Sequence, residues 1–322
     1  MIDGYSRALT LVATAGAGLA AGFYFAFSAV VMKALMSVGG DTTITFLPDG
    51  SASLNPQVLF PASQPDGWDT HAEFLDGSVQ LPVSIGSFLI RTADRRIVVD
   101  LCLGRVDFAV PDLATFKGGR QLDNLAAEGV TPEQIDTVLF THLHHDHVGW
   151  TSNVAPAPNI KAGQVVTGPT FPNARHLVSA AEWHHWSGTS ELIGPDPAAV
   201  QAPLRDRLQF IDDGEDVAPG VRVLATPGHT PGHVSLVVTD PAGRAAQRLV
   251  ILGDVMHWQV QVIESGWSFL FDVDPAQGVA TRELLLKELE DADTVVGGGH
   301  FAGNVFGRVL PPATRRAWRV QR

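Results

Sequence analysis

The 322-residue sequence contains a single cysteine, Cys102, which excludes an intrachain disulfide framework and leaves the redox compartment open. We expect Cys102 to be a small apolar core residue on a strand spanning 96–103. Basic residues are few: 22 Lys and Arg stand against 34 Asp and Glu, and the net charge of −12 repels a phosphate backbone. Because of this charge, a nucleic-acid partner is not expected. The Gly-x-Ser-x-Gly motif of one class of serine hydrolase is also missing, so the sequence does not indicate a serine nucleophile.

Metal-ligand residues, by contrast, are concentrated in one short stretch. Residues 141–149 read Thr-His-Leu-His-His-Asp-His-Val-Gly, with four histidines and one aspartate in six positions, and follow a short apolar run typical of a buried strand. Residues i and i+2 leaving a strand point the same way, so His142 and His144 can share one metal. Asp146 and His147 then turn towards a second metal. Imidazole and carboxylate are ligands that zinc prefers.

Three more ligand-type residues follow probable strands further along the chain. His229 lies in the loop 226–233, Thr-Pro-Gly-His-Thr-Pro-Gly-His, Asp254 ends the apolar run 249–254, and His300 follows three glycines. Glycine beside each of them lets the backbone come close. The recurrence of a strand followed by a ligand loop predicts that one edge of a layered α/β protein forms a metal site.

The motif Thr-His-x-His-x-Asp-His, followed in order by the three later ligands, resembles the metallo-β-lactamase-fold hydrolases over about residues 42–312. The resemblance implies a four-layer αββα sandwich that holds two Zn²⁺ ions. The implied ligands are His142, His144 and His229 for one ion, Asp146, His147 and His300 for the other, and Asp254 as the bridge. The hairpin at 87–100 resembles the opening hairpin of the family, and Asp100 the aspartate that orients ligands without binding metal. A strand-end turn aspartate is the alternative for Asp100.

This ligand set implies hydrolysis without a side-chain nucleophile. Zinc lowers the pKa of bound water from about 16 towards about 7, so a metal-bridging hydroxide would attack a carbonyl carbon or a phosphorus. The expected substrate is a small molecule with an ester-like bond: a lactone, a carboxylester or a phosphotriester. Asp254 would hold the two ions together. Asp146, His257 or a metal-bound water would protonate the leaving group.

Several residues that are typical of other branches of the family are missing from this sequence, which disfavours those branches. The one cysteine precedes the histidine cluster, and position 144 is not the glutamate of diiron members. The only tyrosines, Tyr5 and Tyr24, leave no counterpart for the catalytic tyrosine of acyl-homoserine lactonases. His257, in Gly-Asp-x-x-His, could replace that phenol or merely pack near the site, and this pattern resembles the organophosphate hydrolase and lactonase branch. A mononuclear-iron redox or persulfide-handling protein and a glyoxalase-II-like thioesterase remain alternatives.

Aromatic residues near the ligand motifs could wall a substrate pocket or pack in the core. They are Trp183, Trp186, Trp258, Trp267, Phe269 and Phe271. His145 could contact a metal ligand or the pocket. His184 and His185 match no part of the motif and are expected at the surface.

The N-terminal segment predicts a separate unit. Residues 8–32 carry no charged side chain, and about 20 apolar residues suffice to cross a bilayer. We therefore expect a hydrophobic helix within residues 1–38, acting as a single-pass membrane anchor, and a hydrolase domain at 42–322. The segment resembles the first helix of a family of small multi-helix membrane proteins. There are two alternatives. One is a fused or mis-started reading frame, with a cytoplasmic enzyme, and the other is a helix buried in the catalytic domain.

Overall fold

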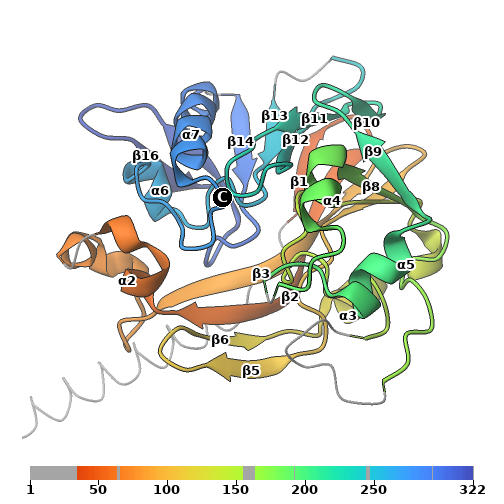
Figure 1. Cartoon of the computed structure of the whole chain (residues 1–322). Helices are drawn as coiled ribbons and strands as arrows, with labels where there is room; N and C mark the ends of the chain where they lie inside the picture. Colours follow the sequence, from red (N-terminus) through yellow and green to blue (C-terminus); the bar gives the residue numbers. More distant parts are fainter. Residues whose placement is uncertain are drawn as a thin grey trace, which may run out of the picture.

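The computed structural model describes most of the chain after residue 34 (Figure 1). The described residues are 35–63, 66–154, 164–191, 193–243, 247–291 and 293–321. Over these ranges the strands form two mixed sheets, one of nine strands and one of seven. The segment 8–32, expected to be a membrane helix, lies outside the described residues. Within the described part of the chain, no helix has both the length and the apolar character needed to cross a membrane.

The first sheet has the strand order β5-β6-β2-β3-β4-β7-β8-β9, with β1 also paired to β2. Its strands are β1 (Leu35–Gly39), β2 (Thr42–Leu54), β3 (Leu81–Arg91), β4 (Arg96–Val99), β5 (Asp107–Val110), β6 (Ala114–Lys117), β7 (Thr137–Leu139), β8 (Arg175–Ser179) and β9 (Leu208–Ile211). Neighbours from β4 to β9 run parallel, and the other pairs are antiparallel. The expected opening hairpin is β3 and β4.

The second sheet follows chain order from β10 to β16. Its strands are β10 (Asp216–Ala218), β11 (Val221–Ala225), β12 (Val234–Val238), β13 (Arg248–Ile251), β14 (Thr294–Gly297), β15 (Phe306–Leu310) and β16 (Ala317–Val320). Only the β13–β14 pair is parallel among these described strands, and the crossover between them contains the longest described helix, α7. Because β13 and β14 run the same way, their carboxyl ends meet at one edge of the sheet.

Helices connect the strands, and several of them cover the outer faces of the sheets. They are α2 (Pro56–Leu59), η1 (Pro61–Ser63), η2 (Gly67–Phe74), α3 (Gln121–Ala127), η3 (Pro132–Gln134), α4 (Ala180–Trp186), η4 (Pro197–Gln201), α5 (Ala202–Leu204), α6 (Val260–Ile263) and α7 (Pro275–Leu289). Figure 1 shows α7 next to the second sheet and α3, α4 and α5 next to the first. The Asp274 side chain caps α7 by accepting from Gln277 N, and Pro275 occupies the first turn.

Alternating strand residues place the core both between the sheets and outside them. In β7, Leu139 joins the cluster shared by the two sheets, whereas Val138 joins the cluster under α3 and α4. In β13, Ile251 belongs to the shared cluster and Val250 packs with α7. Strands buried on both faces are typical of sheets covered by helices. The structure thus has the layered α/β fold that the sequence predicted, and both of its sheets are mixed.

The domain begins earlier than predicted, because residues 35–38 form strand β1 instead of the end of an apolar helix. Met36 and Val38 are buried in the shared core, and β1 pairs with the start of β2. Gly39 and Gly40 have φ values of 120° and 56°, a conformation that glycine adopts readily, so the chain reverses there. The boundary of 38 was wrong because the alternating pattern after Ala34 was assigned to the preceding apolar run.

The strand predicted at 96–103 is also shorter than expected, since β4 ends at Val99. Asp100 and Cys102 have positive φ values of 62° and 50°, so the chain turns sharply there. The turn carries the Asp100 side chain to the metal ligands. Cys102 is buried in the core, as predicted, although it lies in the turn and not on a strand.

Candidate metal centre

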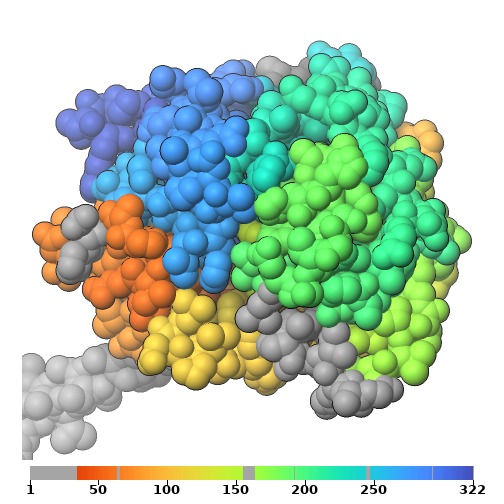
Figure 2. All heavy atoms as spheres, in the orientation of Figure 1, coloured from red at the N-terminus to blue at the C-terminus, as the bar shows by residue number. Residues whose placement is uncertain are grey.

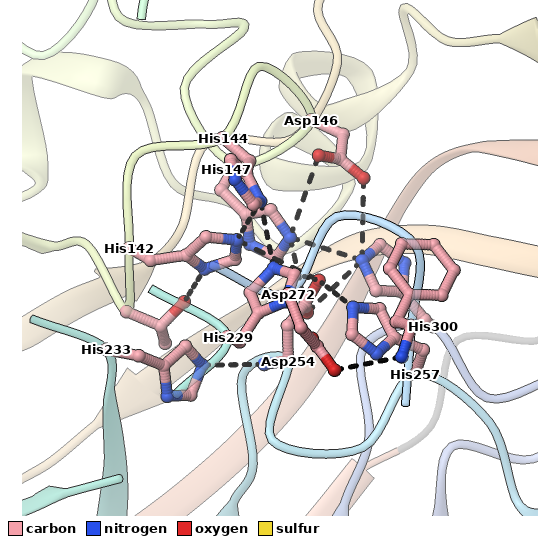
Figure 3. Close-up of polar contacts among 12 residues, drawn as sticks. His142, His144, Asp146, His147, His229, His233, Asp254, His257, Asp272 and His300 are labelled. Carbon is pink, nitrogen blue, oxygen red and sulfur yellow. Dashed lines mark hydrogen bonds and ion pairs between the residues drawn. The ribbon is translucent and has the colours of Figure 1, made fainter. Parts of the chain in front are cut away.

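The structure brings all seven predicted ligands together at one edge of the two sheets (Figure 3). Four follow β7, and the others follow β11, β13 and β14. The ligands are His142, His144, Asp146, His147, His229, Asp254 and His300. All are buried except Asp146, which is partly exposed. Each ligand lies in a loop that follows the carboxyl end of a strand, the position expected for a binding site in such sheets.

The first group consists of three histidines whose ring nitrogens converge. Nδ1 of His144 lies 3.1 Å from Nε2 of His142 and 2.8 Å from Nε2 of His229. The Thr141 hydroxyl donates to Asp100 and therefore accepts from His142 Nδ1, at 3.1 Å. Nε2 of His142 is then left with a lone pair directed at the other two rings. Such an arrangement suits three imidazole ligands around one cation.

The second group has the same property. Nε2 of His147 and Nε2 of His300 lie 3.1 Å apart. The other nitrogen of each ring faces an acceptor: Asp100 Oδ2 at 2.9 Å from His147 Nδ1, and the backbone oxygen of Ser84 at 2.9 Å from His300 Nδ1. Asp146 completes the group, with Oδ2 3.5 Å from His300 Nε2. Asp100 thus has the orienting position that the sequence resemblance implied. It does lie in a turn, as the alternative had it, but its side chain also holds a metal-ligand histidine.

Asp254 lies between the two groups, and its oxygens face different histidines. Oδ2 is 3.8 Å from His142 Nε2 and 3.7 Å from His229 Nε2. Oδ1 is 3.3 Å from Nε2 of both His147 and His300. A carboxylate oriented in this way can give one oxygen to each of two ions.

The charges of the two groups differ. Burial lowers the pKa of the three imidazoles in the first group, so they are neutral and ready to bind. Burial also opposes protonation of His147 and His300, but carboxylates, Asp254 above all, outweigh it and raise both pKa values, that of His300 to about 9. Burial disfavours the charged form of Asp254 as well, yet the facing imidazoles hold its pKa well below the usual range.

The donor set therefore fits a pair of divalent cations. The five imidazoles offer nitrogen lone pairs, and the two aspartates offer carboxylate oxygens. In the absence of a cation, facing ring nitrogens 3 Å apart must share a proton or repel each other. Imidazole and carboxylate ligands suit zinc and similar borderline metals.

Two supporting residues were missed by sequence reasoning. Asp272 Oδ1 lies 2.8 Å from His229 Nδ1, and this carboxylate fixes the His229 tautomer. His233 Nε2 accepts a hydrogen bond from the backbone of Asp254 at 2.8 Å. The second Gly-His of the loop 226–233 was a visible signal for His233. No spacing rule pointed to Asp272, which follows the aromatic segment before α7.

An apolar pocket opens onto the ligands. Of the six aromatic candidates, Phe269 and Phe271 line it. The other four do not: Trp183, Trp186 and Trp258 are buried in the core, and Trp267 packs against Trp68 and Phe60. Core packing, the alternative interpretation, is correct for these tryptophans. Phe60 and Phe116, which also line the pocket, were missed because they lie far from the ligand motifs in sequence.

The segments that line the pocket meet on one face of the molecule. Figure 2 shows α2 (orange), the β5–β6 hairpin (yellow) and the segment before α7 (blue) beside one another on that face. They contribute Leu59, Phe116 and Phe271 to the lining. The pocket wall is thus assembled from three separate parts of the chain, which explains why no local motif predicted it.

Two histidines outside the two groups also line the pocket. His257 stacks on Phe269, with ring centroids 3.8 Å apart, and its Nε2 lies 3.3 Å from Asp254 Oδ2. This position is close enough for His257 to act on a substrate or to share a cation with His229 and Asp254. His145 faces Phe116 edge-on, with ring centroids 6.0 Å apart. Of its two predicted positions, beside a metal ligand or in the pocket, this contact favours the pocket. His184 is exposed, as expected, and His185 is half-buried beside Trp186.

The family profile of the metallo-beta-lactamase superfamily matches residues 82–300, and the chain belongs to this superfamily. It is 27% identical over 178 residues to an N-acyl homoserine lactonase of Bacillus sp, a match that covers 51% of this chain and 62% of that relative. The chain thus spans less than two thirds of that relative's length. An N-acyl homoserine lactonase of Bacillus thuringiensis is 26% identical over 239 residues, covering 68% of this chain and 82% of the relative.

Solved structures share the fold over most of the chain. The dizinc quorum-quenching lactonase AidC superposes with a TM-score of 0.75 at 20% identity, covering 90% of this chain and 97% of that one. The hydrolase AbOPH of the beta lactamase superfamily superposes with a TM-score of 0.71 at 25% identity, covering 91% and 98%. The predicted family is confirmed, and its lactonase relatives agree with the predicted branch. The comparisons do not support the likeness of the N-terminal segment to a membrane-protein helix.

Proposed function

We propose that the protein is a dinuclear zinc hydrolase that cleaves an ester-type bond, in the first place a lactone, in a small apolar molecule. The position of Asp254 carries this proposal. Its two oxygens face two separate groups of ligands at the floor of a pocket, so two ions and a substrate can meet there. Two ions that share a bridging carboxylate are typical of hydrolytic sites, whereas the redox alternative needs a single iron.

The pocket lining indicates the class of substrate. Apart from the histidines and aspartates near the metal centre, the described lining residues are aliphatic or phenylalanine, and none is Lys or Arg. Such a wall suits an uncharged acyl or aryl group and offers no partner for a phosphate monoester or a carboxylate. The lactonase relatives support a lactone as the reacting group.

Different groups in the site would supply the hydroxide and the proton for the leaving group. Bound zinc would polarise the ester oxygen and make hydroxide available near neutral pH. His257 is the residue placed to give a proton to the leaving oxygen, because its ring lines the pocket and its Nε2 has no hydrogen-bond partner among the described residues. Asp146 is less suited to that task, since the imidazoles of His147, His145 and His300 overcome the effect of burial and lower its pKa, which keeps it a carboxylate. Phe269 holds the His257 ring by stacking.

A substrate panel on the purified full-length chain tests the proposal. Metal content would be measured first, with two zinc ions per chain expected. Catalytic efficiency, kcat/KM, would then be compared for acyl-homoserine lactones, an aryl carboxylester, a phosphotriester and a thioester. We expect the lactones to be the best substrates, with activity lost on chelation and restored by zinc. One iron per chain, or a thioester as the preferred substrate, would favour the redox or thioesterase alternative instead.

A further inference from the structure

Glu182, in α4, is a completely buried glutamate that lies behind the first ligand group. Its Oε1 accepts hydrogen bonds from Leu143 N at 2.9 Å and from the indole Nε1 of Trp186 at 2.8 Å. Its Oε2 accepts from Gly232 N at 3.2 Å. Each of these three partners is an N–H donor, so the Glu182 carboxylate accepts from all of them. Burial raises the pKa of Glu182, and hydrogen bonds from the Thr230 side chain and from the three N–H donors oppose that rise.

The partners of Glu182 belong to both chain segments that supply the first group. Leu143 lies between the ligands His142 and His144. Gly232 lies three residues after His229, in the same tight loop. One carboxylate therefore connects two segments that are distant in sequence and that must meet within about 3 Å to bind one ion.

His144 depends on this connection more than the other histidine ligands do. His142, His147, His229 and His300 each direct their second ring nitrogen at a hydroxyl, a carboxylate or a backbone oxygen. Nε2 of His144, in contrast, has no hydrogen-bond partner among the described residues. Its ring packs edge-on against Trp186, with centroids 5.4 Å apart. Trp186 is itself held by Glu182, so both sides of His144 are positioned by the same glutamate.

The packing of Gly232 shows that the loop cannot move closer to α4. A Cβ atom on Gly232 would lie 2.1 Å from Glu182 N and 2.3 Å from Ser179 Oγ. Ser179 Oγ also donates to Gly232 O at 2.8 Å. The start of α4 and the His229 loop are therefore in direct backbone contact, which transmits the position of Glu182 to the ligand loop.

We propose that Glu182 is a positioning residue that fixes the geometry of the first metal group and thereby its affinity for the ion. The inference rests on the two-metal centre of the proposed function and extends it to a residue that touches neither ion nor substrate. Partners that orient metal ligands typically contribute 10- to 100-fold in metal affinity. Glu182 would act on His142, His144 and His229 together through two backbone amides and one indole.

The test compares two isosteric substitutions in buried carboxylates. In Glu182→Gln, the amide nitrogen cannot accept, so at least one N–H of Leu143, Gly232 or Trp186 loses its acceptor. Asp49→Asn is the matched control. Asp49 is equally buried and accepts from three backbone amides and the Trp150 indole, but none of these partners adjoins a ligand of the first group.

The readout is zinc binding to the metal-free full-length chains in competition with a chromophoric chelator, alongside thermal unfolding. His300→Ala identifies which of the two dissociation constants belongs to the second group. We expect Glu182→Gln to weaken the first-group constant by about tenfold or more and to leave the second within a factor of about two. Asp49→Asn should lower stability and leave the first-group constant unchanged.

An unchanged first-group constant in Glu182→Gln, or equal losses in both groups, would overturn the inference. If the wild type itself binds fewer than two zinc ions, the two-zinc centre of the proposed function is contradicted, and the inference about Glu182 fails with it. Trp186→Phe provides an independent variant should Glu182→Gln fail to fold. It keeps the carboxylate but removes the indole donor beside His144, and we expect a smaller loss confined to the first group. Trp186→Phe with wild-type zinc affinity would likewise overturn the inference.

Discussion

His147 and His300 face each other with their Nε2 atoms 3.1 Å apart, while Nδ1 of each ring is directed away, at Asp100 and at the Ser84 backbone oxygen. If both rings were neutral, two lone pairs would point at one another. Three carboxylates around them attract a positive charge to this place, which accounts for the raised pKa values of both histidines. A proton or a metal ion can supply that charge, so the two compete.

This competition predicts that the two ions leave at different pH. The pKa values of His147 and His300 are raised, the latter to about 9, so protons compete for the second group already near neutral pH. The pKa values of the first group are lowered, so protons compete there only at lower pH. As the pH falls, the second-group ion should be released first. Zinc content after dialysis at stepwise lower pH should pass through a plateau near one ion per chain. A single-step loss of both would contradict this order.

Removal of the bridging carboxylate should disrupt both groups. In Asp254→Ala, neither ion keeps its shared ligand, and the facing imidazoles lose their counter-charge. We expect metal content and hydrolysis to fall together, with kcat/KM lower by more than about 100-fold, the upper range for loss of a merely orienting partner. Asp216→Ala, which removes an exposed aspartate paired with Arg222, is the control. Wild-type hydrolysis with full metal occupancy in Asp254→Ala would refute the bridging role.

His257 should affect the leaving group more than the metal. Replacement by Phe keeps a ring against Phe269 but removes the proton donor. General acids typically contribute about 10²- to 10⁴-fold, so kcat for an alkyl ester or lactone should fall by about 100-fold. An ester of 4-nitrophenol, which leaves without protonation, should be much less affected. Metal content should stay at the wild-type level. A loss of one ion in His257→Phe would instead identify His257 as a ligand.

His176 should make folding stability depend on pH. It is completely buried in β8, and burial lowers its pKa to about 4. The unfolded chain, with an ordinary pKa near 6.5, binds a proton that the folded chain does not, so stability is lost as the pH falls from about 6.5 to about 4. The loss from this residue is about 3 kcal/mol. His176→Phe should reduce the pH dependence of the unfolding free energy by that amount. The exposed His184, changed to Phe, should not.

The start of the domain can be tested by truncation. A chain beginning at Leu35 keeps β1 and should fold, bind metal and hydrolyse substrate. A chain beginning at Asp41 loses Met36 and Val38 from the core between the sheets. Two buried apolar side chains contribute about 3–6 kcal/mol, so its unfolding midpoint in urea should fall clearly. Equal midpoints for the two truncations would show that β1 adds nothing to the core.

The grouping of the seven candidate ligands could be predicted from the sequence because each of them belongs to a short motif at a strand end. Asp254 and His300 are far apart in the chain, but β13 and β14 are parallel neighbours, so both side chains reach the same edge. The fold followed from the same repeated arrangement of strand and loop. Its first strand was missed, since two alternating buried residues are a weak signal beside a long apolar run.

The pocket and the supporting residues could not be predicted in the same way. Phe60, Phe116 and Phe269 meet only through tertiary packing, and no period in the sequence relates them. The tryptophans beside the ligand motifs were better candidates by position, yet Trp183, Trp186 and Trp258 pack in the core under α4. Glu182 illustrates the same limit: a charged residue on a short helix is expected at the surface, and only the fold shows that it is buried among backbone amides.

Anomalous X-ray diffraction at the zinc edge, from crystals of the zinc-loaded protein, tests the central claim most directly. The structure predicts two peaks, one among His142, His144 and His229 and one among Asp146, His147 and His300, with Asp254 between them. A single peak, or a peak at the iron edge in protein purified without added metal, would contradict a two-zinc centre.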